Sequence, residues 1–381
     1  MKNKKIFFFV TEDWYFCSHR LPLAIAAKEM GMDVRILTRV AQKKNILKFH
    51  GLNFIHIEID RSSVNPFTEI KKIWDIYNIF RRERPDLIHL VALKPVLLGG
   101  LAARLAGIDN IVAAVTGMGF LFTGKRGVGI LKKAVLALIS SVAQNGKIIV
   151  QNNDDLKLLC STGFNPERIA LIKGAGVDTE YFKPVPEPKG IPVVMLASRL
   201  LWEKGVGEFV EAARLVKNHG IDCSFVLVGE PDLANPGAVP DSKLKAWLTE
   251  GIITWWGKQQ DMPAILSKAT IVCLPSYREG LPKVLLEAMA CGRPCITTDT
   301  PGCRDAVRHG ENGLLVPARD PHALAAAIKQ LLNDPGQRQQ MGRHGRKMTE
   351  TEFSQDRVVQ QTMRIYMDML DNAAETGGRV A

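Results

Sequence analysis

Two cationic side chains stand close together in the segment SRLLWEKG, residues 198–205. Arg199 and Lys204 lie five residues apart, between an apolar run that predicts a strand, 193–197, and a pattern that predicts a helix, 207–218. Fixed cations and the N–H groups of a helix N-terminus both attract anionic groups. We therefore expect this strand end to bind a diphosphate, the alternative being an ordinary cationic pair on a surface loop.

Two carboxylates occur in the segment PSYREGLPKVLLEAMACGRP, residues 275–294, which follows a predicted strand at 271–274. Glu279 and Glu287 are eight residues apart, and Gly280 and Pro282 predict a turn into a helix that begins near Lys283. One carboxylate on the loop and one on the helix can accept hydrogen bonds from hydroxyl groups, such as those of a sugar and a ribose. Glutamate pairs are frequent by chance, but this position between a strand and a Gly-Pro turn is far more specific.

Short apolar runs alternate with helical patterns along the chain, which is typical of βαβ units and parallel sheets. In the first half the predicted strands are 6–10, 34–37, 54–57, 87–91, 111–115 and 148–150, and the predicted helices are 21–30, 69–82 and 128–142. In the second half the strands are 193–197, 224–228, 252–254, 271–274 and 295–298, and the helices are 207–218 and 284–290. The pattern predicts an α/β protein with two Rossmann-like domains.

The segment KPVPEPKGIP, residues 183–192, holds four prolines and predicts an interdomain linker. We expect an N-terminal domain at 1–185 and a C-terminal domain at 186–355. The tail at 356–381 carries an apolar stripe at helical spacing and is expected to pack back towards the N-terminal domain. Parallel sheets place ligands beyond the carboxyl ends of their strands, so the two sheets are expected to face an interdomain cleft.

Composition fits a folded globular enzyme, with 46% apolar and 23% charged residues. None of the seven cysteines forms a CxxC pair, which favours reduced structural thiols. No run approaches the roughly 20 apolar residues of a membrane span, so we expect a cytoplasmic protein.

The net charge of +11 lies wholly in residues 1–185, which contain 27 Lys and Arg and 16 Asp and Glu, whereas the remainder holds 23 of each. This surplus indicates nucleic acid, an anionic membrane or an anionic substrate as partner, or simply a solvated basic surface.

The two segments together resemble the family 4 glycosyltransferases, which are retaining enzymes of the GT-B fold. The family pairs an Arg and a Lys in an SRL-x-x-x-KG context with an EG-x-P-x-x-x-x-E-A-M-A-x-G-x-P segment, and both occur here in order and spacing. The resemblance implies that Arg199 and Lys204 hold the donor diphosphate in place of a metal ion, and that Glu279 contacts the sugar. It implies no cofactor, since the nucleotide sugar, expected to be a UDP-linked N-acetylhexosamine or hexose, is a substrate. The implied donor-binding residues are Gly280, Leu281, Pro282, Lys283 and Glu287.

A paired-glutamate glycosidase is the alternative that the two carboxylates raise. Hydrolases need their carboxylates on either side of a bond, whereas Glu279 and Glu287 share one strand-to-helix segment beside a cationic pair. The transferase interpretation is therefore favoured, with Glu279 in an electrostatic and positioning role.

The segment at 11–20 is expected to be a loop on the acceptor side, and its EDW…SHRLP form resembles the subgroup that extends polyprenyl-diphosphate-linked sugars in bacterial surface polysaccharide assembly. Asp13, His19 and Arg20 are its candidate acceptor residues.

Many family members carry a histidine after the strand at 111–115, where this chain reads Thr116-Gly117-Met118-Gly119-Phe120. Gly117 and Gly119 would allow close backbone approach to a phosphate or sugar. His19 or His89 would then take the histidine's place.

A basic and apolar segment at 125–138 predicts an interfacial helix that docks on the anionic inner face of the cytoplasmic membrane. The same chemistry on a lipopolysaccharide-core or soluble acceptor remains an alternative, as does a GT-B nucleotide-sugar epimerase, which the donor segment disfavours. A nucleic-acid binder is disfavoured because the chain lacks aromatic residues interleaved with its basic ones.

Overall fold

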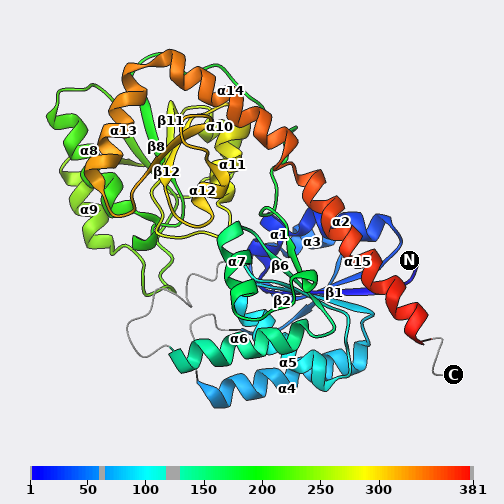
Figure 1. Ribbon diagram of the computed structural model, residues 1–381. Coiled ribbons are helices and arrows are strands. Elements are labelled where there is room, and N and C mark those ends of the chain that lie inside the picture. The colour runs from blue at the N-terminus through cyan, green and yellow to red at the C-terminus, as the bar shows by residue number, and fades with distance from the viewer. Residues whose placement is uncertain (1, 60–64, 117–128, 378–381) are drawn as a thin grey trace. The chain divides into compact units, whose positions relative to one another are not determined.

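The computed structural model describes residues 2–59, 65–116 and 129–377 (Figure 1). The chain forms two compact units, one of Met1–Ala175 with Arg357–Ala381 and one of Gly176–Asp356. The second unit begins earlier than the proline-rich segment because the chain already pairs there: Val177 N–H donates to Phe353 O at 2.9 Å, and Gln355 N–H donates to Val177 O at 3.0 Å. The segment 183–192 also lies on this unit, where Arg338 forms an ion pair with Glu187 at 2.6 Å.

The first unit contains, within the described residues, a seven-stranded parallel sheet of order β3-β2-β1-β4-β5-β6-β7. The order reverses between β1 and β4, as in doubly wound dinucleotide-binding folds. Its strands are β1 (Lys5–Glu12), β2 (Asp33–Arg39), β3 (Asn53–His56), β4 (Leu87–Val91), β5 (Ile111–Ala114), β6 (Lys147–Val150) and β7 (Ile169–Leu171).

Helices cover both faces of this sheet, which is why β1 is buried along both of its sides. Phe7 and Phe9 pack in a cluster with α4, α5 and α6, whereas Phe8 and Val10 pack with α1, α2 and α15. The helices of this unit are α1 (Asp13–His19), α2 (Leu21–Glu29), α3 (Lys44–Phe49), α4 (Pro66–Glu83), α5 (Leu93–Leu105), α6 (Gly129–Ala143), α7 (Asn153–Ser161), the 3-10 helix η2 (Pro166–Arg168), and α15 (Gln355–Gly377), which starts in the second unit.

The second unit also has a parallel sheet, which within the described chain has six strands in the order β10-β9-β8-β11-β12-β13. Its strands are β8 (Val193–Ala197), β9 (Ser224–Val228), β10 (Thr254–Trp255), β11 (Ile271–Leu274), β12 (Cys295–Thr298) and β13 (Gly313–Val316). Its helices are η3 (Trp202–Lys204), α8 (Val206–Asn218), α9 (Asp241–Thr249), α10 (Met262–Leu266), α11 (Lys283–Ala290), α12 (Cys303–Ala306), α13 (Pro321–Asn333) and α14 (Pro335–Thr351). The predicted class of two parallel Rossmann-like sheets is confirmed.

The prediction of a loop at 11–20 is wrong. β1 continues to Glu12, and Asp13–His19 forms α1. The helix is stable here because Phe16 is fully buried against the ring of Phe8, at a centroid distance of 5.6 Å, so a tertiary contact overrides a locally weak helical pattern.

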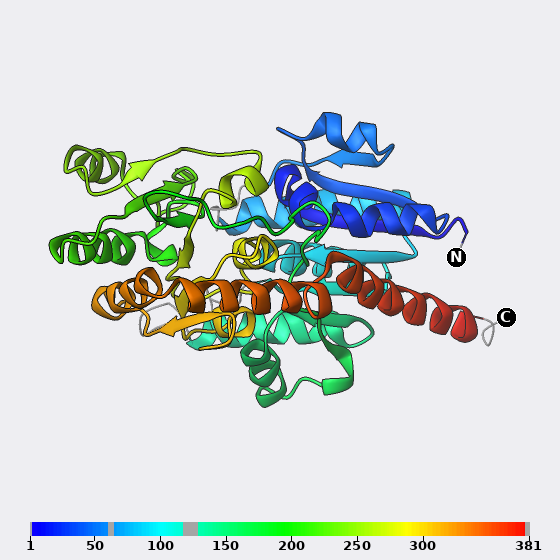
Figure 2. The ribbon, with the colours of Figure 1, turned by 90° about the horizontal axis from the view of Figure 1, so that it is seen from above.

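The C-terminal helix α15 packs on the first unit beside β1 and β4 (Figure 2). Tyr366 is fully buried, and its hydroxyl forms a hydrogen bond with Nδ1 of His89 on β4. The His89 ring also stacks on Phe8 at 5.4 Å. Burial, assisted by the nearby Arg20 cation, holds the pKa of His89 well below its ordinary value, so the imidazole is neutral.

We expect Tyr366→Ala to lower the free energy of unfolding of the first unit by about 3–5 kcal/mol, because it leaves a cavity and strands a buried imidazole. Arg364→Ala, an exposed position on the same helix, should change it by less than about 0.5 kcal/mol. Urea denaturation of both variants provides the measurement. Equal stabilities for the two variants would show that α15 is not docked through Tyr366.

Candidate functional site

The cationic and acidic motifs meet where the strand order of the second sheet reverses. Arg199 and Lys204 follow β8, and Glu279 follows β11, the strand hydrogen-bonded to β8 on the other side of the reversal. In open parallel sheets the connections leave such a point in opposite directions, which opens a crevice for a ligand at the carboxyl ends of the strands. The sequence motifs therefore lie at the kind of position where open parallel sheets bind their ligands.

Lys204 and Glu279 form an ion pair in which Nζ lies 2.6 Å from Oε1. Both side chains are largely buried, with exposed fractions of 13% and 15%. Ser276 Oγ donates to the same carboxylate oxygen at 2.7 Å. Two donors thus fix the Glu279 carboxylate beside the ammonium, which concentrates charge in a partly desolvated position.

Backbone contact explains why Lys204 reaches Glu279. Gly205, which follows η3, has φ of 71°, and a Cβ there would lie 2.2 Å from Pro275 O. Only glycine accommodates both the left-handed conformation and that approach. The end of η3 is therefore pressed directly onto the start of the loop that carries Glu279.

A second glycine supports the same loop from β12. Glu279 N–H donates to Pro301 O at 3.0 Å, and Gly302 has φ of 80°. A Cβ at Gly302 would lie 2.4 Å from Glu279 O and 2.5 Å from Gly280 O. The Pro301-Gly302 turn thus serves as a platform for the acidic loop.

Tyr277 ties the acidic loop to the cationic segment. Its N–H donates to Glu203 O at 2.9 Å, and its hydroxyl donates to Oε1 of Glu208 on α8 at 2.6 Å. The guanidinium of Arg319 stacks over the Tyr277 ring at 4.6 Å. Burial and the hydrogen bond to Glu208 raise the pKa of Tyr277 to about 12, so its hydroxyl remains a donor at neutral pH.

Arg199 is held by a different carboxylate. Its Nη1 lies 2.7 Å from Oδ2 of Asp232, in the connection after β9, and the Arg199 side chain is 41% exposed. Exposed ion pairs contribute little net free energy, so an anionic ligand can compete with Asp232 for this guanidinium.

The second glutamate lies on α11, which begins at Lys283 after Pro282. Glu287 Oε1 lies 3.4 Å from Lys283 Nζ, one turn earlier on the helix. Burial raises the pKa of Glu287, and the Lys283 cation opposes that rise. Of the predicted donor residues, Gly280 and Lys283 are partly exposed, whereas Leu281, Pro282 and Glu287 are buried.

The three predicted acceptor residues, Asp13, His19 and Arg20, lie in the first unit. Asp13 is fully buried, and its Oδ2 accepts the N–H groups of Ala41, Gln42 and Lys43 at 2.8, 2.8 and 2.7 Å. Its other oxygen has no hydrogen-bond partner among the described residues. Asp13 therefore fixes the connection after β2.

His19 and Arg20 end α1 in contrasting environments. His19 is partly exposed, stacks on Tyr15 at 4.1 Å, and its Nδ1 lies 3.2 Å from Tyr15 O. Arg20 is buried, donates to His19 O at 3.1 Å, and its Nε has no partner among the described residues. His89 belongs to the core with Tyr366, so His19 is the more accessible of the two candidate histidines. Gly117 and Gly119 lie outside the described residues.

Sequence reasoning missed Ser276, Asp232 and Tyr277. Ser276 and Tyr277 belong to the quoted acidic segment, so their proximity to Glu279 was available as a signal, whereas Asp232 follows a different strand and had none.

In the part of the chain that the structure describes, no group of three His, Cys, Asp or Glu side chains could hold a metal ion. Over the same residues, no helix is both long and apolar enough to cross a bilayer.

Two family models match the chain. The model described as "Glycosyl transferases group 1" matches residues 177–348, and the model described as "Glycosyl transferase 4-like" matches residues 5–152. The first spans the Lys204–Glu279 site, and the second spans most of the first sheet.

Curated relatives match over nearly the full length. An N,N'-diacetylbacillosaminyl-diphospho-undecaprenol alpha-1,3-N-acetylgalactosaminyltransferase of Campylobacter jejuni is 27% identical over 371 residues, covering 93% of this chain and 96% of the relative. A UDP-Gal:alpha-D-GlcNAc-diphosphoundecaprenol alpha-1,3-galactosyltransferase of Escherichia coli is 27% identical over 326 residues, covering 81% and 82%.

Solved structures share the fold. HepE from Anabaena, in complex with UDP and glucose, superposes with a TM-score of 0.75 at 18% identity, covering 96% of this chain and 100% of that one. Sucrose-phosphate synthase from Thermosynechococcus elongatus superposes with a TM-score of 0.80 at 20% identity, covering 97% and 100%. Two Rossmann-like units, a paired cation and carboxylate at the switch point, and two glycosyltransferase family models that together span most of the chain show that it belongs to the glycosyltransferases of the GT-B fold.

Proposed function

We propose that this glycosyltransferase moves a sugar, with retention of anomeric configuration, from a UDP-linked N-acetylhexosamine or hexose to a polyprenyl-diphosphate-linked sugar in bacterial glycan assembly. The observation that carries the donor side is the Lys204, Glu279 and Ser276 constellation at the switch point of the second sheet. The acceptor is supported by the two relatives whose names specify undecaprenol-diphosphate-linked sugars.

Charge development on the leaving group explains the need for the two cations. As the bond between the anomeric carbon and the diphosphate oxygen breaks, its electron pair remains on that oxygen. Within the described residues, Lys204 makes one side-chain hydrogen bond, to Glu279, and an ammonium has three donors. Two donors therefore remain for diphosphate oxygens, and Arg199 supplies a second cation. Neutralisation by these side chains would take the place of a metal ion.

Glu279 orients the donor sugar and stabilises the positive charge that develops on it. Ser276 and Lys204 hold its carboxylate at one oxygen, so the carboxylate presents a fixed negative charge to the positive charge that develops on the sugar ring. The acceptor hydroxyl oxygen forms the new glycosidic bond at the anomeric carbon, and its proton passes to an oxygen of the departing diphosphate, which keeps the electron pair of the broken bond. Glu287 and the backbone of 280–283 would contact the ribose and phosphates.

The acceptor is assigned to the first unit, where the positive charge is concentrated. His19 is its most accessible candidate, while Asp13 shapes the neighbouring loop through three backbone N–H groups. A lipid-linked acceptor would bring the enzyme to the inner face of the cytoplasmic membrane as a peripheral protein.

The direct test of function is a panel of nucleotide sugars incubated with purified enzyme and polyprenyl-diphosphate-linked sugar acceptors, with mass detection of the product. Extension of the acceptor by one sugar, with the anomeric configuration of the donor, supports the proposal. Donor consumption without acceptor would instead indicate an epimerase or hydrolase.

Lys204→Ala should lower turnover at least about 100-fold, equivalent to roughly 2.7 kcal/mol of lost transition-state stabilisation. The matched control is Lys245→Ala, because Lys245 pairs with Asp241 at 3.4 Å on the exposed surface of α9 in the same unit. Initial rates at saturating donor compare the two variants. Wild-type turnover in Lys204→Ala would remove this lysine from leaving-group stabilisation.

Activity should survive treatment with EDTA, because the proposed charge neutralisation uses side chains. Initial rates are compared before and after chelation, with magnesium and manganese added back separately. Loss of activity that either ion restores would contradict the metal-independent mechanism.

A further inference from the structure

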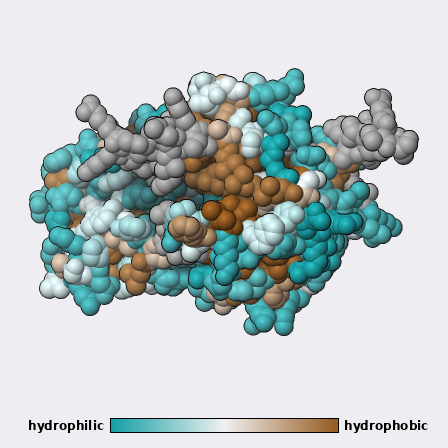
Figure 3. Space-filling view, turned by 90° about the horizontal axis from the view of Figure 1, so that it is seen from below, coloured by the Kyte–Doolittle hydropathy of each residue, from teal (hydrophilic) through white to brown (hydrophobic). Residues whose placement is uncertain are grey.

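Helix α4 exposes large apolar side chains on its outward face. Phe67, Ile70 and Trp74 have exposed fractions of 82%, 63% and 59%. They lie at positions i, i+3 and i+7, which places them in one stripe along the helix. Figure 3 views the molecule from the side on which α4 lies in Figure 1, and hydrophobic residues gather there among hydrophilic ones.

The inward face of α4 packs against the hydrophobic core. Ile76 and Phe80 are fully buried, and the Phe80 ring meets Phe7 of β1 edge-on at 6.1 Å. Glu69 is tied to Lys94 of α5 by an ion pair of 2.8 Å. The helix is therefore fixed to the sheet, and the outward stripe is additional to what the fold requires.

The charges around the stripe are mostly positive. Lys71 is exposed beside it, and Arg81, Arg82 and Arg84 are exposed at the C-terminal end of α4. Arg81 also lies over the Tyr77 ring at 5.9 Å, extending the aromatic surface that Tyr77 forms with Trp74.

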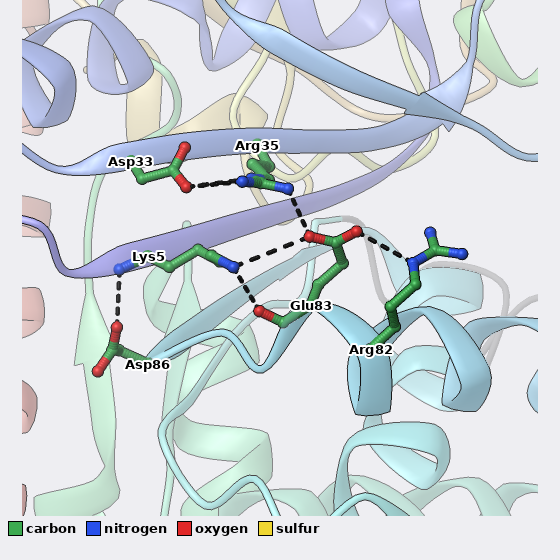
Figure 4. Close-up of polar contacts among 6 residues, drawn as sticks. All are labelled: Lys5, Asp33, Arg35, Arg82, Glu83 and Asp86. Atoms are coloured by element: carbon green, nitrogen blue, oxygen red, sulfur yellow. Dashed lines mark hydrogen bonds and ion pairs between the residues drawn. The ribbon is translucent and has the colours of Figure 1, made fainter.

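The acid at the end of α4 is neutralised from the sheet. Figure 4 shows Glu83 between Arg35 of β2, Lys5 of β1 and Arg82, with Lys5 at 3.8 Å and Arg82 at 3.2 Å. The Glu83 side chain is only 15% exposed. Its charge therefore offsets little of the positive potential that α4 presents to the outside.

We propose that the outward face of α4 docks the enzyme on an anionic lipid bilayer, with Phe67, Ile70 and Trp74 inserted at the interface and the basic residues at the headgroups. Aromatic and aliphatic side chains flanked by Lys and Arg are the composition that favours the membrane interface. The complementary partner is anionic because the net charge of +11 is carried wholly by residues 1–185.

A second protein is a poorer match for this face. Three such side chains bury at most about 500 Å², short of the roughly 800 Å² per partner of a stable protein interface. Lysine is also depleted from interface cores. The proposal rests on and deepens the proposed function, which requires access to a lipid-linked acceptor, and it places docking on α4 instead of on the segment at 125–138.

The test is cosedimentation of purified full-length protein with vesicles of phosphatidylcholine alone or with phosphatidylglycerol. The variant carrying Phe67→Ser, Ile70→Ser and Trp74→Ser should bind anionic vesicles at least about 30-fold more weakly than wild type, since burying such groups drives insertion. The matched control is Phe49→Ser, since Phe49 is a comparably exposed aromatic residue, at 86%, on α3 of the same unit. It should bind as wild type does.

Two further measurements separate insertion from simple charge attraction. Wild type should retain part of its binding at 1 M salt, where the screening length falls to about 3 Å, whereas Lys71→Glu with Arg81→Glu should lose preference for anionic lipid. Trp74→Phe should still bind, but the fraction of tryptophan emission quenched by brominated lipid should fall.

The proposal is overturned if the triple variant binds as wild type does, or if changing Lys125, Arg126, Lys132 and Lys133 to Glu alone abolishes binding. It is also overturned if the triple substitution leaves vesicle binding unchanged and instead converts a dimer of the protein to a monomer. Transfer to a water-soluble acceptor analogue should be equal in wild type and triple variant. A failure of the glycosyltransferase assignment would instead appear as no transfer by either protein, with vesicle binding unaffected.

Discussion

The ion pair between Lys204 and Glu279 is the interaction on which the account of the donor site depends. It joins the connections that follow β8 and β11, two neighbouring strands whose helices leave in opposite directions. A parallel sheet brings the ends of its strands to one edge, but it does not by itself bring two side chains within hydrogen-bonding distance. That closeness comes from glycine. Gly205 rests on Pro275, and Gly302 rests on Glu279 and Gly280, each at a distance that excludes any Cβ. A rigid acidic loop is thereby held beside a rigid cationic segment.

Tyr277 shows how the same constraint extends beyond the charged pair. Its backbone bonds to Glu203 and its hydroxyl to Glu208, so one residue of the acidic loop contacts both sides of the η3 to α8 junction. A site that stabilises a leaving group benefits from such preorganisation, because donors that are already in place need no reorganisation during the reaction. Arg199 differs, since it is more exposed and engages the carboxylate of Asp232. The two cations therefore differ in rigidity: Lys204 is fixed, and Arg199 can adjust.

Much of this was predictable from the sequence. The strands at 224–228, 271–274 and 295–298 match β9, β11 and β12 to the residue, because each is a short apolar run bounded by polar or turn residues. The charged site residues were predicted from their types and positions beyond strands. β7 and β13 were missed: β7 has three residues, all partly exposed, and β13 begins at Gly313 in a segment rich in turn-forming residues. α1 was taken for a loop because its stability comes from Phe16 in the core. The Asp232 contact with Arg199 and the exposure of the α4 stripe depend on which segments meet in three dimensions, which periodicity does not report.

In the first unit, helix α4 carries hydrophobic residues on two faces, one buried and one turned outward. α4 has a pattern that any amphipathic prediction would place against a sheet, and Ile76 and Phe80 are indeed there. Phe67, Ile70 and Trp74 instead face outward among cations, which suits a boundary between water and lipid.

The donor-site proposal is that the cations of the second unit hold the diphosphate of the donor. It is tested most directly by calorimetric titration of wild type and of Arg199→Ala with Lys204→Ala, using UDP and uridine. The account predicts that wild type binds UDP at least about 100-fold more tightly than uridine and that the double variant loses most of this ratio. An unchanged ratio in the double variant would contradict it.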